Sequence, residues 1–188
     1  MHYLVLALPY VVLIIQLLTL VFLCWWIGMG ILNYLRKRPP FVPVSSKVIP
    51  DIISALDLQP DSKFYDLGCG DGKVLLAATA AAPEANCIGI EFDWFPFKIA
   101  KIKCRKIPNI SLLRENFFQT DLASATHIFT YLFPHTMNEL LPKLEQELRP
   151  GTRLVSCDFK FTEKEPIQII DLHRDENKLC RFLYIYEF

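Results

Sequence analysis

A glycine-rich stretch of the chain, KFYDLGCGDGKVLL, holds the residues best suited to bind a nucleotide. Gly68, Gly70 and Gly72 come after an apolar run and before an alanine-rich one, which is the order of strand, tight turn and helix in dinucleotide-binding folds. Glycines allow a sharp turn and let the backbone approach a ligand without a Cβ atom in the way. Asp66 and Asp71 flank this turn, so the predicted nucleotide site is acidic.

Two common phosphate-binding motifs do not fit this turn. The G-x-G-x-x-G motif requires a third glycine where Lys73 stands, and the P-loop motif requires a serine or threonine where Val74 stands. A carboxylate within ~4 Å of a phosphate also costs about 1 kcal/mol in water and more in a cleft. Because Asp66 and Asp71 flank the turn, we expect a nucleoside with cationic groups. S-adenosylmethionine, which carries an ammonium and a sulfonium, meets this description.

Residues after two further predicted strands could complete a site for the adenosyl group. Glu91 ends the second strand, 23 residues after the first glycine of the turn, where a carboxylate can accept hydrogen bonds from both ribose hydroxyls. Asn116 and Phe117 end the third strand and could bind adenine, the amide by hydrogen bonds and the ring by stacking. We include the neighbouring Cys69 and Phe92 in this predicted cofactor site.

The end of a fourth predicted strand is the place where a methyl acceptor would dock. Tyr131 and Pro134, in the segment YLFP, are therefore our acceptor-side candidates. A buried strand that stops at a proline explains the same residues equally well. His127 and His135 are more typical of structural or surface positions than of a base, so we assign no catalytic base.

The elements that must position these residues alternate between strands and helices. Strands are predicted at 63–67, 86–92, 111–116, 127–133, 152–159, 167–173 and 180–188, and helices at 44–58, 71–82, 94–107 and 136–151. Strands separated by helices form parallel sheets with right-handed crossovers, whereas the last two strands form an antiparallel hairpin. We therefore expect an α/β fold with a Rossmann-like, mostly parallel seven-stranded sheet that ends in this hairpin. The first helix should lie over one end of the sheet.

Charge and cysteine content narrow the range of partners. Three of the 20 basic residues lie at 36–38, so the chain after residue 38 carries 17 basic and 20 acidic residues. This balance argues against a nucleic-acid partner. The six cysteines form no C-x-x-C pair and no cluster with zinc-ligand spacing, so we expect neither a disulfide framework nor a bound metal.

The N-terminal part of the chain is predicted to be a membrane anchor. Residues 11–32 would make an apolar helix of about 33 Å, long enough to cross a hydrocarbon core of about 30 Å. A cleaved signal peptide is the alternative, but the run is too long and no A-x-A site precedes the domain. The basic sequence RKR at 36–38 should stay on the cytoplasmic side, or on the matrix side in a mitochondrion. We therefore expect a single-pass membrane protein with its C-terminal domain on that side.

The chain thus divides into three predicted parts. Residues 1–38 are the anchor with its basic end, 39–62 are a proline-containing linker followed by a helix, and 63–188 are the nucleotide-binding domain. The prolines make the linker extended and fairly stiff, which keeps the domain near the membrane.

Four segments in this order, DLGCGDG, GIEFD, RENFFQTDL and LRPGTRLV, resemble the class I S-adenosylmethionine-dependent methyltransferases. With the N-terminal span and PPFVPVSSKVI, the chain is similar to the small membrane-anchored protein-lysine methyltransferases. The mitochondrial members of that family modify the ATP synthase c subunit and the adenine nucleotide translocase. The resemblance implies cofactor-binding roles for Asp66, Gly68, Gly70, Asp71 and Glu91.

This chain departs from the family pattern at two places. Asn116 stands where the family usually has an aspartate, and YLFP stands where those enzymes tend to have a small-residue turn before the proline.

From the resemblance as a whole, the first hypothesis is methyl transfer to a lysine of a membrane-associated protein. The alternatives are a methyltransferase that acts on a lipid or small molecule, and a non-catalytic scaffold that only binds S-adenosylmethionine.

Overall fold

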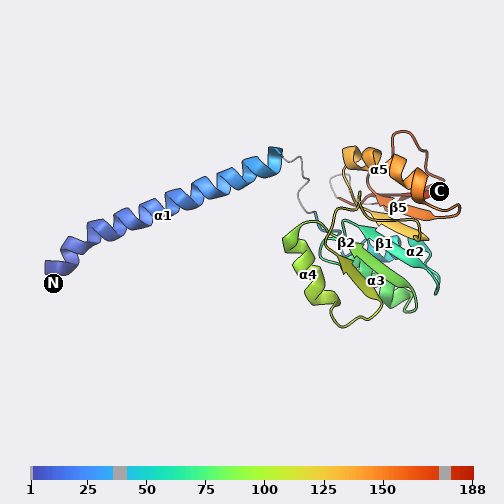
Figure 1. Ribbon diagram of the computed structural model, residues 1–188, viewed down its shortest axis with the longest axis horizontal. Helices are drawn as coiled ribbons and strands as arrows, with labels where there is room; N and C mark the ends of the chain where they lie inside the picture. Colours follow the sequence, from blue (N-terminus) through green and yellow to red (C-terminus); the bar gives the residue numbers. More distant parts are fainter. Residues whose placement is uncertain (1, 36–41, 174–178) are drawn as a thin grey trace. The chain divides into compact units, whose positions relative to one another are not determined.

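The computed structural model describes residues 2–35, 42–173 and 179–188 and, within the first of these ranges, the side chains of residues 9–31. It divides into two compact units, Met1–Pro40 and Phe41–Phe188. The first unit contains one helix, α1 (His2–Leu35) (Figure 1). Its segment Pro9–Ile31 is long and apolar enough to cross a membrane, and none of it is buried. The predicted apolar helix is thus confirmed.

The second unit is an α/β domain, in which helices and strands alternate along most of the chain (Figure 1). Its helices are α2 (Ile49–Leu56), α3 (Lys73–Ala81), α4 (Trp94–Cys104) and α5 (Pro134–Glu147). Its strands are β1 (Lys63–Leu67), β2 (Asn86–Ile90), β3 (Ile110–Leu113), β4 (His127–Thr130), β5 (Arg153–Cys157), β6 (Gln168–Asp171) and β7 (Phe182–Glu187).

These strands form a seven-stranded sheet in the order β3-β2-β1-β4-β5-β7-β6. The first five strands of this order are parallel, because a helix or a long loop returns the chain to the same end of the sheet before each strand. Strand β7 is antiparallel to both β5 and β6. The predicted fold class, a mostly parallel sheet with a terminal antiparallel hairpin, is confirmed.

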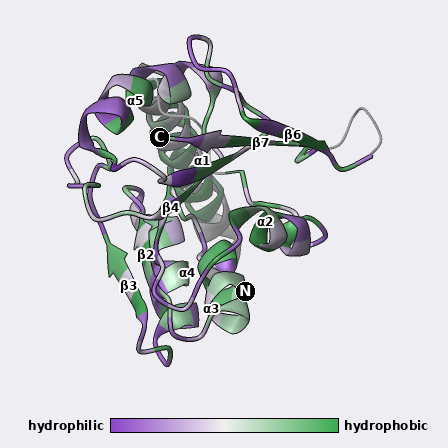
Figure 2. Ribbon diagram, turned by 90° about the vertical axis from the view of Figure 1, so that its right-hand side faces the viewer, coloured by the Kyte–Doolittle hydropathy of each residue, from purple (hydrophilic) through white to green (hydrophobic). Residues whose placement is uncertain are grey.

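The two faces of the sheet are covered by different helices. Phe64 and Phe129 belong to one core cluster, which also contains the buried side chains of α2 and α3. Tyr65 and Ile128, one residue away on the same strands, belong to a second cluster with the buried side chains of α5. This alternation follows from the two-residue period of a strand, and Figure 2 shows α2 and α5 on opposite sides of the sheet.

Helix α2 differs from its prediction in length and in place. It begins at Ile49, with Pro50 in its first turn, where a proline is tolerated because its missing N–H has no helical partner. Its buried residues, Ile52 and Leu56 among them, pack on the face of the sheet and not over its end. The Arg153 Nε atom also donates a hydrogen bond of 2.8 Å to the Ala55 carbonyl, which ties α2 to β5.

Several strands end earlier than the sequence predicted, and this leaves the candidate residues in loops. Strands β2, β3 and β4 stop at Ile90, Leu113 and Thr130. Leu67 of β1 pairs with Ile90 and with Thr130, and Ile90 pairs with Leu113, so all these ends lie along one edge of the sheet. The loops that follow the strands therefore meet at this edge.

Candidate functional site

The glycine turn leaves β1 and is fastened to the neighbouring strand. Gly68, Gly70 and Gly72 all have positive φ angles, between 55° and 78°, which residues with a Cβ atom rarely adopt. The N–H groups of Gly68 and Cys69 both donate to the Ile90 carbonyl, at 2.8 and 3.0 Å. The turn therefore has a fixed place at the end of β2, as a binding loop requires.

Two helices pack closely at the end of this turn. Gly72 directly precedes α3, and a Cβ atom at this position would come within 3.1 Å of the Cys104 Sγ atom and 3.3 Å of the Ala100 Cβ atom in α4. The third glycine thus allows α3 to begin directly against α4.

Asp66 is a buried carboxylate in β1, just before the turn. It precedes the last residue of β1, and only 2% of its surface is exposed. Burial raises the pKa of Asp66 well above its usual value, and the nearby Glu91 and Asp71 raise it further. Among the described residues, none donates a hydrogen bond to its carboxylate. A positively charged donor from a ligand would relieve both conditions.

Glu91 braces the glycine turn from the end of β2. Its Oε2 atom accepts a hydrogen bond of 3.0 Å from the Gly70 N–H, and its Oε1 atom accepts one of 2.7 Å from the Asp93 N–H. Its own N–H donates to the Leu113 carbonyl at 3.0 Å. Burial raises the pKa of Glu91, although these backbone hydrogen bonds act in the opposite direction. The Glu91 carboxylate therefore links the turn to the start of α4, and the Glu91 backbone N–H links both to the end of β3.

Asp71 is paired with lysines and does not stand alone as an acidic group. Its Oδ2 atom lies 2.6 Å from Nζ of Lys103 in α4 and 3.8 Å from Nζ of Lys73 in α3. The acidity on which the sequence prediction depended is thus offset at Asp71. Among the described residues, no cation is paired with the Asp66 carboxylate at the start of the turn.

The residues predicted to bind adenine follow β3 at the same edge. The Asn116 Oδ1 atom accepts a hydrogen bond of 3.1 Å from the Phe118 N–H, which fixes the local turn. The Phe117 ring lies 4.8 Å from the Phe118 ring and packs against the second core cluster. Phe92, after Glu91, is 45% exposed.

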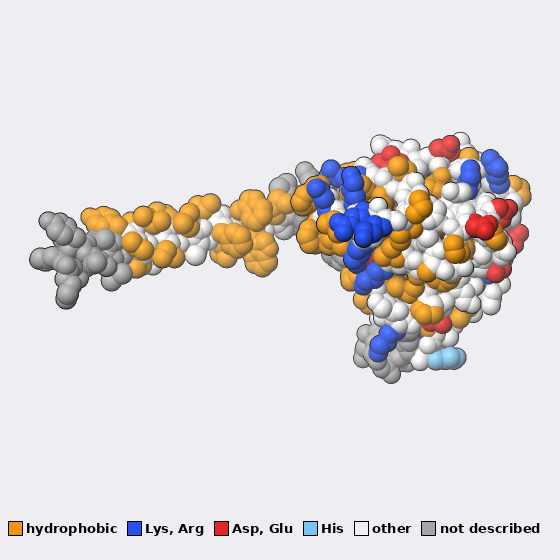
Figure 3. All heavy atoms as spheres, turned by 90° about the horizontal axis from the view of Figure 1, so that it is seen from below, with side chains coloured by type: hydrophobic (Ala, Val, Ile, Leu, Met, Phe, Trp, Pro, Cys, Tyr) orange, Lys and Arg blue, Asp and Glu red, His pale blue; other side chains and the backbone are white. Residues whose placement is uncertain are grey.

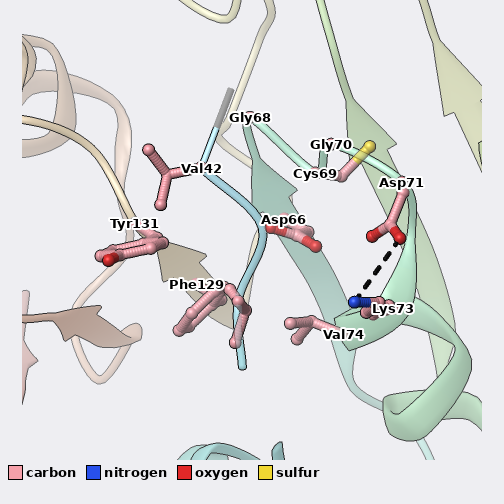
Figure 4. A pocket seen from close by; sticks show the side chains of 11 residues that line it. Val42, Asp66, Gly68, Cys69, Gly70, Asp71, Lys73, Val74, Phe129 and Tyr131 are labelled. Carbon is pink, nitrogen blue, oxygen red and sulfur yellow. Dashed lines mark ion pairs between the residues drawn. The ribbon is translucent and has the colours of Figure 1, made fainter. Parts of the chain in front are cut away.

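A cleft opens beside the glycine turn (Figure 4). It brings together five predicted cofactor residues and the predicted acceptor residue Tyr131. Its lining consists of Val42, Val44, Asp66, Gly68, Cys69, Gly70, Asp71, Lys73, Val74, Phe129 and Tyr131. Four other predicted cofactor residues, Glu91, Phe92, Asn116 and Phe117, lie outside this lining. Pro134 also lies outside it, exposed at the first turn of α5.

The Tyr131 ring forms part of the cleft wall and is held in place by a neighbouring aromatic ring. The ring is stacked on that of Phe159, with centroids 6.2 Å apart. Burial raises the pKa of the Tyr131 phenol well above its usual value of 10, and Cys180 and Asp158 nearby raise it further. Tyr131 therefore keeps its proton at neutral pH and can act as a hydrogen-bonding group but not as a base.

Five cleft residues were missed by the sequence prediction. Val42 and Val44 come from the segment before α2, Lys73 and Val74 begin α3, and Phe129 lies within β4. The alternation of Val42 and Val44 within FVPVSS is a weak signal of an extended segment with one buried side. Lys73 had no local signal, because its role depends on how α3 leaves the turn.

A cluster of Cys157, Asp158 and Cys180 lies behind Tyr131, with its ligand-type atoms within 4.8 Å of one another. The Asp158 carboxylate accepts hydrogen bonds from the N–H groups of Cys180, Arg181 and Phe182, at 2.5, 2.6 and 3.2 Å. Both of its oxygens thus accept hydrogen bonds from backbone N–H groups at the start of β7. This arrangement explains the cluster as a structural one.

Comparison with known proteins connects this geometry to a family. Residues 66–168, more than half of the chain, match the sequence model of a family described as the ANTKMT methyltransferase domain. The chain is similar to a protein-lysine N-methyltransferase of Saccharolobus islandicus (strain REY15A), at 30% identity over 150 residues, which cover 78% of this chain and 92% of that protein. It is also similar to the adenine nucleotide translocase lysine N-methyltransferase of Mus musculus, at 26% identity over 139 residues, which cover 72% of this chain and 60% of that protein.

The chain therefore spans nearly all of the first relative and less than two thirds of the second. A solved structure of an RNA methyltransferase from Salinibacter ruber, in complex with S-adenosyl-L-homocysteine, has a similar fold. Its TM-score is 0.70 at 28% identity, and the match covers 78% of this chain and 93% of that one. The matched family range contains every predicted cofactor and acceptor residue.

Proposed function

The chain belongs to the ANTKMT methyltransferase domain family of class I S-adenosylmethionine-dependent methyltransferases, and from this premise we propose that it methylates a lysine of a membrane-associated protein. The predicted enzyme class and cofactor are thereby confirmed. Lysine as the acceptor is supported by two relatives that are named lysine methyltransferases. A membrane-associated substrate is supported by the apolar helix α1 and by the mouse relative, whose name specifies a membrane carrier as substrate.

The observation that carries this proposal is the buried Asp66 carboxylate, which shares a cleft with Tyr131. A bound ammonium would supply the donor and the positive charge that Asp66 lacks among the described residues. Lys73, in the same cleft, can attract the carboxylate of the methionyl end. When bound, S-adenosylmethionine supplies a methyl group made electrophilic by the sulfonium.

The adenosyl group is assigned to the loops after β2 and β3. Each Glu91 oxygen already accepts one backbone hydrogen bond, and each has a second lone pair for a ribose hydroxyl. Asn116 would accept from the adenine amino group, and Phe117 and Phe92 would contact the ring. The glycines of the turn would let the backbone approach the ligand closely.

Tyr131 is assigned to the acceptor side of the cleft. Methyl transfer is an in-line displacement, so the protein chiefly positions the two reactants and excludes water. Because its phenol keeps its proton, Tyr131 would orient an incoming amine through a hydrogen bond and would not remove the amine's proton. Burial of a lysine near the positive sulfonium itself favours the neutral, nucleophilic amine.

The membrane part of the proposal assigns α1 as a single-pass anchor. The basic residues at 36–38 would then stay in the cytoplasm, or in the matrix of a mitochondrion, with the catalytic domain on the same side. Anchoring confines enzyme and substrate to one membrane and raises their effective concentration. Protease treatment of inverted membrane vesicles tests this orientation: the domain should be digested, and its protection would show the opposite topology.

Transfer of a tritiated methyl group to membrane extracts tests the proposed substrate class. Labelled products should be separated into protein, lipid and RNA fractions, because relatives and alternatives differ in acceptor. We expect label in a membrane protein, and acid hydrolysis should recover it as methyl-lysine. Label confined to lipid or to RNA would refute the lysine assignment, whereas cofactor binding without label in any fraction would indicate a scaffold.

The matched control for this experiment is Asp66→Asn, which removes the carboxylate that should hold the cofactor. Any label that persists in extracts with this variant comes from another enzyme. A second control, Asp61→Asn, removes an exposed carboxylate outside the cleft and should leave the labelling unchanged.

A further inference from the structure

Helix α4 (Trp94–Cys104) combines exposed apolar and basic side chains. Its buried residues, Pro96, Ala100 and Cys104, are spaced four apart and form one narrow stripe against the domain. The opposite side carries Trp94, Phe95 and Ile102, which are 55%, 66% and 63% exposed. Large apolar side chains gathered on the exposed face of a helix are typical of a surface that binds a partner or a membrane.

The same outer face is strongly basic. Lys98 and Lys101 lie on it and are exposed, and the exposed Arg105 and Lys106 follow directly after the helix. No acidic residue occurs between residues 94 and 114, although the chain after residue 38 has more acidic than basic residues. Figure 3 views the molecule from below Figure 1, and it shows Lys and Arg side chains gathered beside hydrophobic ones. The positive charge of the domain is thus concentrated at α4.

Within this surface the two kinds of side chain are interleaved. The Lys98 Nζ atom lies over the Trp94 ring, 5.5 Å from its centroid. An indole beside ammonium groups is the combination found at membrane interfaces, where the ring enters the headgroup layer and the cations meet lipid phosphates.

We infer that the outer face of α4 binds the surface of an anionic lipid bilayer. Its cations match the charge of acidic headgroups, and Trp94, Phe95 and Ile102 are suited to enter the interfacial layer. The same chain contains a helix that can cross a membrane, so we take a bilayer as the binding partner of this surface. The inference does not depend on the methyl acceptor, so it can fail or hold independently of the proposed lysine substrate.

This contact would also orient the cleft. Helix α4 begins three residues after Glu91, and its Lys103 reaches the glycine turn through Asp71, at 2.6 Å. An α4 that rests on the bilayer would therefore hold the cofactor loops at a set distance from the membrane. A substrate lysine that projects from the lipid would then approach the cleft in a limited range of directions.

The fluorescence of Trp94 provides a direct test with the full chain. The three tryptophans are at positions 25, 26 and 94, so a Trp25→Phe/Trp26→Phe background leaves Trp94 as the single reporter. This protein should be reconstituted in phosphatidylcholine vesicles with and without phosphatidylserine, each containing brominated acyl chains as quenchers. We expect strong quenching of Trp94 in the anionic vesicles, weaker quenching in the neutral ones, and a loss of the difference at high salt.

A charge-reversal variant separates the role of α4 from that of the anchor. Lys98→Glu/Lys101→Glu/Arg105→Glu should lose most of the quenching, whereas Lys63→Glu/Arg149→Glu/Lys160→Glu, with the same charge change at exposed sites elsewhere, should keep it. Lys103 stays unchanged in both because it pairs with Asp71. Binding of S-adenosylmethionine, measured by calorimetry, should be equal in the two variants and shows that both are folded.

Two outcomes would overturn the inference. One is equal quenching in the charge-reversal variant and its control. The other is that aqueous acrylamide quenches Trp94 equally well in anionic vesicles and in detergent while the brominated lipids do not quench it, because Trp94 would then be in water. A mobility-shift assay with a mixed-sequence RNA tests whether α4 binds nucleic acid instead of lipid. If charge reversal abolishes RNA binding and leaves the lipid quenching intact, α4 is a nucleic-acid surface.

Discussion

The Oε2 atom of Glu91 accepts a hydrogen bond of 3.0 Å from the N–H of Gly70, which lies 21 residues earlier in the chain. A carboxylate expected to hold a ribose therefore also holds the loop that must surround the ligand. The other Glu91 oxygen accepts from the Asp93 N–H at 2.7 Å, just before α4 begins. We therefore expect loop shape and ligand affinity to depend on the same side chain.

Replacement of Glu91 by alanine should abolish measurable binding of S-adenosylmethionine. The variant loses the predicted ribose contact and leaves the Gly70 and Asp93 N–H groups without their acceptor. Each hydrogen bond to a charged group contributes about 1.5–3 kcal/mol, so the loss of the two expected ribose hydrogen bonds should lower affinity by well over a hundredfold. Titration calorimetry measures the affinity, and circular dichroism verifies the fold. Glu91→Gln keeps one acceptor oxygen and should fall in between, whereas wild-type affinity in Glu91→Ala would remove Glu91 from the site.

Asp66→Asn should bind the cofactor poorly and yet make the ligand-free protein more stable at neutral pH. The folded-state pKa of Asp66 is raised above its usual value of 3.8, so the contribution of this group to stability is full below that value and is lost as pH rises through the folded pKa. An amide carries no charge to bury and escapes this loss. The melting temperature should rise by about 2–4 °C for each kcal/mol that is relieved.

The pH dependence provides the check on this explanation. The stability difference between Asp66→Asn and the wild type should shrink as pH is lowered, because the wild-type carboxyl group then becomes neutral too. Thermal melts at several pH values measure it, with Asp61→Asn as the exposed control. A stability gain that stays constant down to acidic pH would point to a cause other than the buried charge.

Gly89→Ala should damage both stability and cofactor binding, although Gly89 lies outside the cleft. A Cβ atom at this position in β2 would come within 2.4 Å of Leu75 Cδ1, 2.8 Å of Cys69 Sγ and 2.9 Å of Leu112 Cδ2. Overpacking of this kind typically costs about 1–3 kcal/mol, and a displaced Cys69 would shift the glycine turn. Denaturant unfolding and calorimetry measure the two effects.

Gly151→Ala is the contrasting variant. This glycine has a φ angle of +87°, and nothing lies within 4 Å of a Cβ atom placed on it. The substitution should cost about 1–2 kcal/mol through backbone strain and leave cofactor affinity unchanged. Equal losses of affinity in both variants would mean that the packing behind the turn does not control binding.

Tyr131→Phe should slow methyl transfer without weakening cofactor binding. The ring remains stacked on Phe159, but the hydroxyl that should orient the amine is removed. We expect kcat to fall by about tenfold or more, as for the loss of one hydrogen bond in the transition state. Tyr65→Phe is the control, because its hydroxyl contacts Ser124 on the other side of the sheet. A larger loss in Pro134→Ala than in Tyr131→Phe would move the acceptor site to the start of α5.

Much of the fold followed from local patterns in the sequence. The boundaries of β1, the glycine turn and the order of strands and helices were all predicted, because strand period and glycine conformation depend on residues near one another in the chain. The strand ends were less accurate, since β2, β3 and β4 stop at the point where the sheet edge opens and backbone partners run out. The position predicted for helix α2 was wrong, because the surface that its apolar stripe covers depends on how the sheet is assembled.

The site divides in the same way. The sequence by itself determined the cofactor class, through three glycines beside Asp66 and a carboxylate after β2. Only the tertiary structure decided that Lys103, 32 residues away, neutralises Asp71, and that Tyr131 enters the cleft while Pro134 stays outside. It also decided that the basic residues of α4 face outward together with Trp94. Contacts of this kind join residues that are distant in the chain, and such contacts depend on the path of the whole chain and leave no periodic signal in the sequence.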